Sequence, residues 1–200
     1  MSLIEETAIP LMALPVAQFR AHLRLGTGFT DDDVQDAVLE SFLRAALATI
    51  EARTGKILIE RDFSWELRRW RDAAEQPLPV APVSLVLGLT VRDRMDDPIP
   101  VEAASYRLVP DMQRPLLQAT GSCLPSIPSG GAAEIRFVAG FGPGWADLPA
   151  DLGQAVLLLA AHYYDNRAAA APSGGPMPFG VSSLIDRYRT VRLLGGGPGA

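Results

Sequence analysis

The sequence predicts an α+β fold in which helices and strands occupy separate stretches of the chain. Near both ends of the chain, apolar residues recur every three or four positions, as in helices that bury one face. In the middle they alternate with polar residues, as in half-buried strands. With 200 residues, of which 48% are hydrophobic and 20% charged, the chain has the size and composition of one globular domain with appended arms.

Two helices are expected in the first third of the chain, over residues 15–25 and 31–54. In the longer one, apolar side chains recur at three- and four-residue spacing, which predicts one buried face. Thr30 is expected to cap its N-terminus, and the three aspartates at 31–33 lie in the first turn, where the helix dipole favours negative charge. Gly55 supplies the stop at the C-terminus.

A mostly antiparallel β region is predicted over residues 57–140. Apolar and polar residues alternate over 63–68 and again over 83–91, and shorter strands are expected at 106–109 and 134–139. Prolines between the first two strands predict an extended connection. In the longest strand, five apolar residues at every second position are expected to share one face: Val83, Leu85, Leu87, Leu89 and Val91.

Residues 149–167 are predicted to form another helix, with Pro149 at its first position. Residues 168–178 are rich in alanine, glycine and proline, which indicates a flexible linker. We therefore expect a single domain over residues 1–167, followed by the linker and a short terminal helix within residues 168–200.

The terminal helix carries the candidate interaction site. Ser183 and Asp186 form a capping-box pattern, which predicts a helix that continues to about Leu194. A helix of roughly a dozen residues on a tether is marginal alone, so it needs a surface on which to dock. Its arginines contrast with the formal net charge of −5 of the whole chain, which favours an acidic partner. The candidate interface residues are Phe179, Leu184, Ile185, Arg187, Tyr188, Arg189, Val191 and Arg192.

Composition argues against several other classes of protein. A net charge of −5 does not suit a general nucleic-acid binder, and a single cysteine, Cys123, excludes an internal disulfide. The two histidines, His22 and His162, lack the spacing of a metal site. The longest apolar run, 155–161, is far shorter than the roughly 20 residues that span a bilayer. No enzyme activity, metal, cofactor or membrane contact is therefore expected.

Several stretches that are weak signals alone occur in the order and spacing of one family. They include Leu-Pro-Val followed by Ala-His-Leu-Arg near the N-terminus, Ala-Arg-Thr-Gly-Lys-Ile-Leu-Ile at the end of the long helix, and the proline-rich Leu-Pro-Val-Ala-Pro-Val. Ile-Arg-Phe-Val-Ala-Gly-Phe-Gly, Ala-His-Tyr-Tyr-Asp-Asn-Arg and Met-Pro-Phe-Gly-Val follow. Together they span nearly the whole chain and resemble the head-to-tail connector (adaptor) proteins of long-tailed phages and of phage-derived gene transfer agents.

The resemblance implies a non-enzymatic structural protein of the particle neck. Such proteins form a ring, commonly twelve-fold, beneath the portal protein, and they bind the stopper or another tail-side neck protein below. DNA passes through the channel of the ring as non-specific cargo. The resemblance further implies assembly in the bacterial cytoplasm and release as part of the particle.

Two other classes stay open on the sequence alone. One is another neck or tail-completion protein, or a capsid-decoration protein, of the same kind of particle. The other is a small-ligand-binding domain or enzyme whose site is built from scattered residues. The source (phage, prophage remnant or gene transfer agent) and the number of subunits stay open as well.

Overall fold

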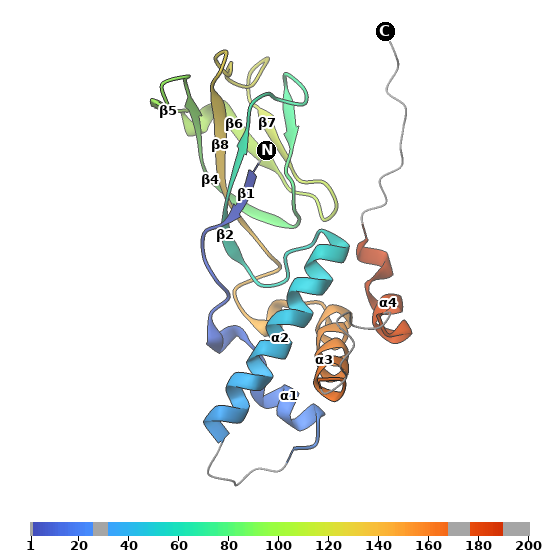
Figure 1. Ribbon diagram of the computed structural model, residues 1–200. Coiled ribbons are helices and arrows are strands. Elements are labelled where there is room, and N and C mark those ends of the chain that lie inside the picture. Colours follow the sequence, from blue (N-terminus) through green and yellow to red (C-terminus); the bar gives the residue numbers. More distant parts are fainter. Residues whose placement is uncertain (1, 26–31, 168–176, 190–200) are drawn as a thin grey trace.

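Helices and strands are segregated in space, although a short strand at residues 2–5 precedes the first helix in the sequence. The computed structural model describes residues 2–25, 32–167 and 177–189. Figure 1 shows a helical part at one end of the molecule and a β part at the other. The helices within these ranges are α1 (Val16–His22), α2 (Asp32–Thr54), α3 (Ala150–Asp165) and α4 (Phe179–Ile185). The predicted α+β class is confirmed.

The β part consists of two antiparallel sheets. Its strands are β1 (Ser2–Glu5), β2 (Arg61–Leu67), β3 (Glu75–Pro77), β4 (Val83–Arg92), β5 (Pro98–Pro100), β6 (Tyr106–Val109), β7 (Leu116–Ala119) and β8 (Ala132–Ala139). The larger sheet has the order β1-β2-β8-β4-β5 and the smaller one the order β3-β7-β6. Sequence patterns found β2, β4, β6 and β8, whereas the four missed strands each have only three or four residues.

Strand β4 departs from the alternation predicted for it. Two β-bulges in its N-terminal half shift its register against β8. Each bulge adds a residue and so changes the face on which the neighbouring side chains lie. Val83, Leu89 and Val91 are buried, but Leu85 and Leu87 are 54% and 45% exposed. The prediction that all five residues share one face is therefore wrong for Leu85 and Leu87.

The helical part buries an apolar core of its own. The buried side chains recur at helical spacing on α2 and α3, and α1 adds one phenylalanine. They include Leu39, Leu43, Leu47 and Ile50 of α2, Leu152, Val156 and Leu159 of α3, and Phe19 of α1. Burying one such side chain contributes about 1.5–3 kcal/mol. Packing of these faces, more than helix propensity, therefore stabilises the three helices.

A second core lies inside the β part. Phe63 of β2 and Phe137 of β8 are cross-strand partners whose rings stack with centroids 5.8 Å apart. Leu117 of β7 and Ile135 of β8 are fully buried in the same cluster. The two cores form separate clusters of buried residues, so the fold also needs contacts where the helical part meets the β part.

Most predicted helix ends agree with the structure to within a few residues. Gly55 has a φ of 69°, and its N–H donates to the carbonyl of Glu51, so the expected stop of α2 is confirmed. α1 is shorter than predicted, because Arg24 adopts a φ of 55° that a helix cannot continue through. The predicted cap residue Thr30 lies outside the described residues.

None of the described helices is both long and apolar enough to cross a membrane.

The C-terminal helix begins earlier than predicted. α4 starts at Phe179, so Ser183 lies inside it and does not open it, and the capping-box prediction is wrong. The helix instead begins after Pro178, whose carbonyl accepts the N–H groups of Val181 and Ser182 at 3.0 and 3.1 Å. A single 3-10 turn, Asp186–Tyr188, follows the helix. The predicted linker, apart from its last two residues, and the predicted helix end at about Leu194 lie outside the described residues.

Candidate interaction surface

The C-terminal segment, residues 177–189, packs against helices of its own chain. In Figure 1, α4 lies beside α3, and the two helices are in contact. Val181 and Ile185, four residues apart and thus on one face of α4, are buried in the core of the helical part. The same chain therefore supplies a docking surface for the apolar face of this short helix.

Tyr188 anchors the end of the segment. Its hydroxyl donates a hydrogen bond of 2.8 Å to Oδ1 of Asp151, and its ring meets Phe141 edge-on with centroids 6.4 Å apart. The neighbouring Arg187 pairs with Oδ2 of Asp151 at 2.8 Å and places its guanidinium 4.7 Å from the centre of the Tyr188 ring. Burial raises the pKa of Tyr188, which keeps the phenol protonated as a donor to Asp151.

The predicted interface residues fall into three groups. Three turn wholly or partly toward the protein's own core: Leu184, Ile185 and Tyr188. Three face solvent: Phe179, Arg187 and Arg189. Two lie outside the described residues: Val191 and Arg192. Phe179 is the most notable of the exposed group, because a phenylalanine 87% exposed is available to a partner.

Sequence reasoning missed Asp151, which holds both Arg187 and Tyr188. Asp151 lies in the first turn of α3, where an acidic side chain is already explained by the helix dipole. Its hydroxyl partner is 37 positions away in the sequence. No local pattern signals such a pair, so only the packing of α4 on α3 shows it.

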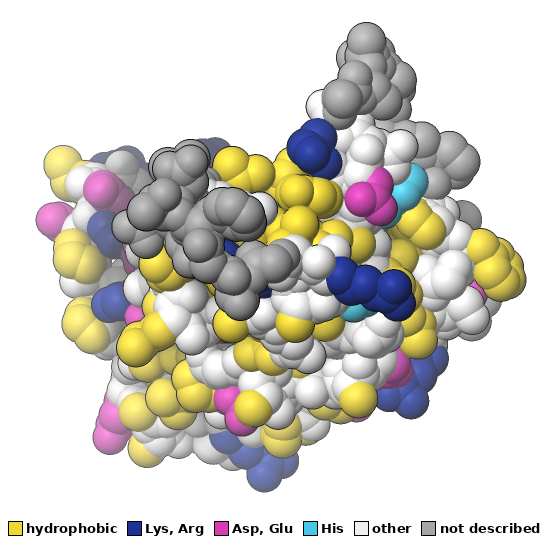
Figure 2. Space-filling model, turned by 90° about the horizontal axis from the view of Figure 1, so that it is seen from below, with side chains coloured by type: hydrophobic (Ala, Val, Ile, Leu, Met, Phe, Trp, Pro, Cys, Tyr) yellow, Lys and Arg dark blue, Asp and Glu magenta, His cyan; other side chains and the backbone are white. Residues whose placement is uncertain are grey.

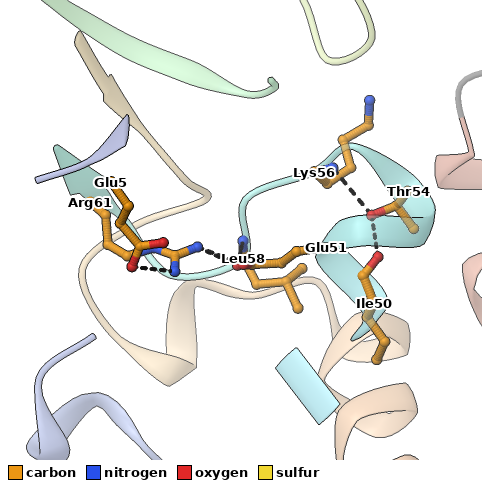
Figure 3. Close-up of polar contacts among 7 residues, drawn as sticks. All are labelled: Glu5, Ile50, Glu51, Thr54, Lys56, Leu58 and Arg61. Atoms are coloured by element: carbon orange, nitrogen blue, oxygen red, sulfur yellow. Dashed lines mark hydrogen bonds and ion pairs between the residues drawn. The ribbon is translucent and has the colours of Figure 1, made fainter. Parts of the chain in front are cut away.

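Buried charges join the helical part to the β part (Figure 3). Arg61, at the start of β2, is 6% exposed. Its Nη2 atom donates to both carboxylate oxygens of Glu51 on α2, at 2.7 and 2.6 Å, and its Nη1 atom donates to Glu5 on β1 at 2.9 Å. Glu51 also accepts the backbone N–H of Leu58 at 2.8 Å. Burial raises the pKa of Glu51, against the opposing charge of Arg61.

Lys56 is a second buried charge at this junction. It follows α2, and its Nζ atom donates to Oε1 of Gln113 at 2.8 Å. Desolvation lowers the pKa of Lys56, and the carboxylate of Asp111 opposes this effect. The hydroxyl of Thr54 accepts the backbone N–H of Lys56 and donates to the carbonyl of Ile50 (Figure 3). These polar groups thus connect the end of α2 to the β part.

The remaining candidate groups are dispersed. His22 lies on α1 and His162 on α3, and in the ranges that the structure describes no three potential ligands gather as a metal site. Cys123 is an exposed free thiol. Figure 2 views the helical end of the molecule, where charged side chains of both signs are scattered among hydrophobic ones. The visible part of this end is therefore mixed in character.

Comparisons with known proteins identify close structural relatives, although no family model and no curated protein matches the chain. A chain in the neck of an empty GTA particle, computed with C6 symmetry, is 56% identical, with a TM-score of 0.89 and coverage of 99% of this chain and 100% of that one. A chain in the virion of a native gene transfer agent (GTA) particle is 55% identical, with a TM-score of 0.86 and coverage of 98% and 99%. A chain in the neck of a native GTA particle, computed with C12 symmetry, is 52% identical, with a TM-score of 0.85 and coverage of 99% and 100%.

Proposed function

The chain belongs to the head-to-tail connector (adaptor) family of gene transfer agent necks, and on this premise we propose that it is the structural connector between head and tail of such a particle. The observation that carries the proposal is an identity of 52–56% that extends over nearly the full length of both chains. The protein assembles in the bacterial cytoplasm and leaves the cell as part of the particle.

In this proposal the connector acts as a ring. The similar necks were computed with C6 and C12 symmetry, which supports a closed ring of identical chains. We expect twelve copies around a channel through which DNA passes as non-specific cargo. A net charge of −5 on each copy supports a weakly repulsive channel that does not retain DNA.

The portal protein on one side of the ring and the stopper or another tail-side protein on the other are the expected partners. The exposed residues of the C-terminal segment, Phe179, Arg187 and Arg189, together with Val191 and Arg192 beyond it, form the proposed contact with the portal. Exposed aromatic and arginine side chains are enriched at protein interfaces, which supports this assignment. Ile185 and Tyr188 have a different role, because they hold the segment on its own helical core.

We assign the protein no catalytic, metal or cofactor role. Two charged side chains among the described residues are buried, Arg61 and Lys56, and each has a partner within the fold. Arg61 binds Glu51, and Lys56 binds Gln113. Both pairs join elements of the fold, as expected of a structural protein.

Solution mass measured by light scattering, across a concentration series and with or without the cognate portal protein, tests the proposal. A mass near twelve subunits, or a monomer that joins a ring-sized complex when portal is added, supports the connector function. A monomer of about 21 kDa that ignores portal at every concentration contradicts it. Binding to a tail tube or capsid in place of portal would instead favour a tail-completion or decoration protein.

Surface variants test the proposed portal contact without unfolding the segment. Phe179→Asp combined with Arg189→Glu changes two exposed side chains and leaves the buried residues of α4 intact. We expect portal binding to weaken at least tenfold while the thermal unfolding midpoint stays within about 1 °C. Met12→Asp, at a residue 93% exposed on another element, is the matched control.

A further inference from the structure

The larger sheet ends in two edges that lack a complete partner. β1 forms one edge and pairs only with β2. At the other edge, β5 pairs with only the last three residues of β4, Thr90–Arg92. Apart from the ladder to β8, no described residue shares a main-chain hydrogen bond with residues 83–88 of β4. β6 comes near β4 but belongs to the other sheet.

The free edge of β1 presents regularly spaced backbone groups. The N–H of Glu6 donates to the carbonyl of Asp62 at 2.8 Å. Ile4, two residues earlier and opposite Ser64, therefore also has its backbone groups directed toward β2. Because hydrogen-bonded residues alternate along an antiparallel pair, the N–H and C=O groups of Leu3 and Glu5 point away from β2. Every residue of β1 is exposed.

The free part of β4 is apolar. Residues 83–88 include neither a charged residue nor a proline, the two side-chain devices that commonly protect sheet edges. β-Bulges commonly protect an edge by twisting it away from an incoming strand. In β4 the bulges instead turn Leu85 and Leu87 toward solvent. An edge of this kind is suited to receive another strand.

The topology brings β1 of one copy to β4 of the next in the correct direction. A ring of identical chains needs two different surfaces on each copy that fit one another, and these two edges lie at opposite ends of one sheet. The strands β1, β2, β8 and β4 are successively antiparallel. A neighbouring copy in the same orientation therefore presents its β1 antiparallel to this copy's β4.

Charge on the outer face of the sheet supports the same contact. Beside the free part of β4, the exposed Arg136 of β8 lies opposite Gly88, where no side chain covers it. Arg136 forms no ion pair within the described ranges. At the β1 end, the same face carries Glu6, which accepts a hydrogen bond from Ser64, and the exposed Glu66. When β1 of one copy lies beside β4 of the next, Glu6 and Glu66 of the first copy come close to Arg136 of the second.

We infer that β1 of one subunit adds to residues 83–88 of β4 in the next subunit, so that the large sheets join edge to edge around the ring. The occupant of the open β4 edge is a second copy of this chain. The inference rests on the proposed ring function and specifies the contact that closes the ring.

Cysteine cross-linking within the full-length protein tests the contact. In a Cys123→Ser background, which removes the exposed native thiol, Ile4→Cys is combined with Leu85→Cys or with Leu87→Cys to allow for a shift in register. Ile4 and Leu85 both lie on the outer face, where neighbouring strands bring side chains within disulfide distance. Oxidation of assembled particles or portal complexes should give a ladder of covalent oligomers up to ring size, whereas each single variant should stop at the dimer.

A backbone variant gives a second readout. Leu3→Pro removes an N–H that points away from β2, so the protein's own ladder stays intact, whereas Ile4→Pro removes a bond to Ser64. Leu3→Pro should leave the unfolding midpoint within about 2 °C and lower ring formation at least tenfold.

Three outcomes separate this inference from the proposed function. A ladder together with loss of rings in Leu3→Pro supports the inference. Rings that assemble without a ladder in either double variant overturn it and leave the connector function standing. Failure of the wild-type chain to form any ring with the portal protein overturns both.

Discussion

The hydroxyl of Tyr188 donates a hydrogen bond of 2.8 Å to Oδ1 of Asp151, and this bond joins the C-terminal segment to the first turn of α3. The segment is therefore held by its own chain at one end, while Phe179 at its other end faces solvent. If Phe179 contacts the portal protein, as we propose, this arrangement presents it on a backbone that is already positioned. The entropy lost on binding is then smaller than for a free tether.

Removal of this hydroxyl should loosen the C-terminal segment. Tyr188→Phe keeps the buried ring and loses the bond to Asp151, which should cost about 1 kcal/mol and lower the unfolding midpoint by roughly 2–4 °C. Amide hydrogen exchange of α4 should accelerate. Tyr164→Phe is the control, because the Tyr164 hydroxyl bonds to no described residue. Equal protection of α4 in Tyr188→Phe and wild type would contradict the anchoring role.

Loss of the arginine at the junction should destabilise the fold strongly. Arg61→Met leaves the carboxylate of Glu51 buried without its partner, which costs about 3–5 kcal/mol in comparable sites. Glu5→Gln should cost less than about 1 kcal/mol, because the Glu5 side chain is partly exposed. The double variant Arg61→Met with Glu51→Leu should recover only part of the loss, because it removes the unpaired charge but also the acceptor of the Leu58 N–H. Chemical denaturation measures all three, and a small effect of Arg61→Met alone would show that the buried ion pair does not stabilise the junction.

Replacement of the buried lysine should stabilise the protein at neutral pH. Lys56→Met removes the desolvation of an ammonium group, and we expect a gain of about 1 kcal/mol. Because the folded-state pKa of Lys56 is lowered below its unfolded value, the wild type gains stability as pH rises from the folded to the unfolded pKa. The advantage of Lys56→Met should therefore shrink toward pH 10.5. Arg114→Met, at an exposed position of the same region, is the control. If the stability gained by Lys56→Met stays constant with pH, desolvation of the Lys56 ammonium group is not its cause.

The bulged register of β4 has a direct mutational test. Leu89→Ala should cost about 2–5 kcal/mol, because it empties a buried position. Leu87→Ala, two residues earlier, should change the stability of the isolated chain by less than about 0.5 kcal/mol, because its side chain is half exposed. Under the unbroken alternation that the sequence suggests, both substitutions would cost the same. Comparison of the two unfolding free energies distinguishes the registers.

Local signals predicted the parts of the fold that depend on neighbouring residues. The α+β class, the span of α2 and its stop at Gly55 follow from helical periodicity and from the left-handed backbone that glycine adopts. The strand with Phe63 and Trp65 follows from alternation. The capping pattern at Ser183 failed, because the buried faces of Val181 and Ile185 extend the helix back to Phe179.

The candidate site was predictable only in part. The sequence predicts an interaction segment near the C-terminus that includes Phe179, Arg187 and Arg189. All three are exposed, and their contact with a partner stays a prediction. It also named Ile185 and Tyr188, whose apolar faces are instead covered by the chain's own helices. An amphipathic pattern shows that a face needs to be buried, but it does not show which surface buries it.

The sequence by itself determined the fold class, the main helices and strands, and the family to which the chain belongs, because periodicity, capping residues and ordered motifs are local properties. The tertiary structure decided the bulges of β4, the pairing of Arg61 with Glu51 and Glu5, and the anchoring of Tyr188 on Asp151. Each of these depends on the distance in space between residues of different helices, strands or turns, or on how two strands pair. Packing of the whole chain sets such distances, and local propensity does not.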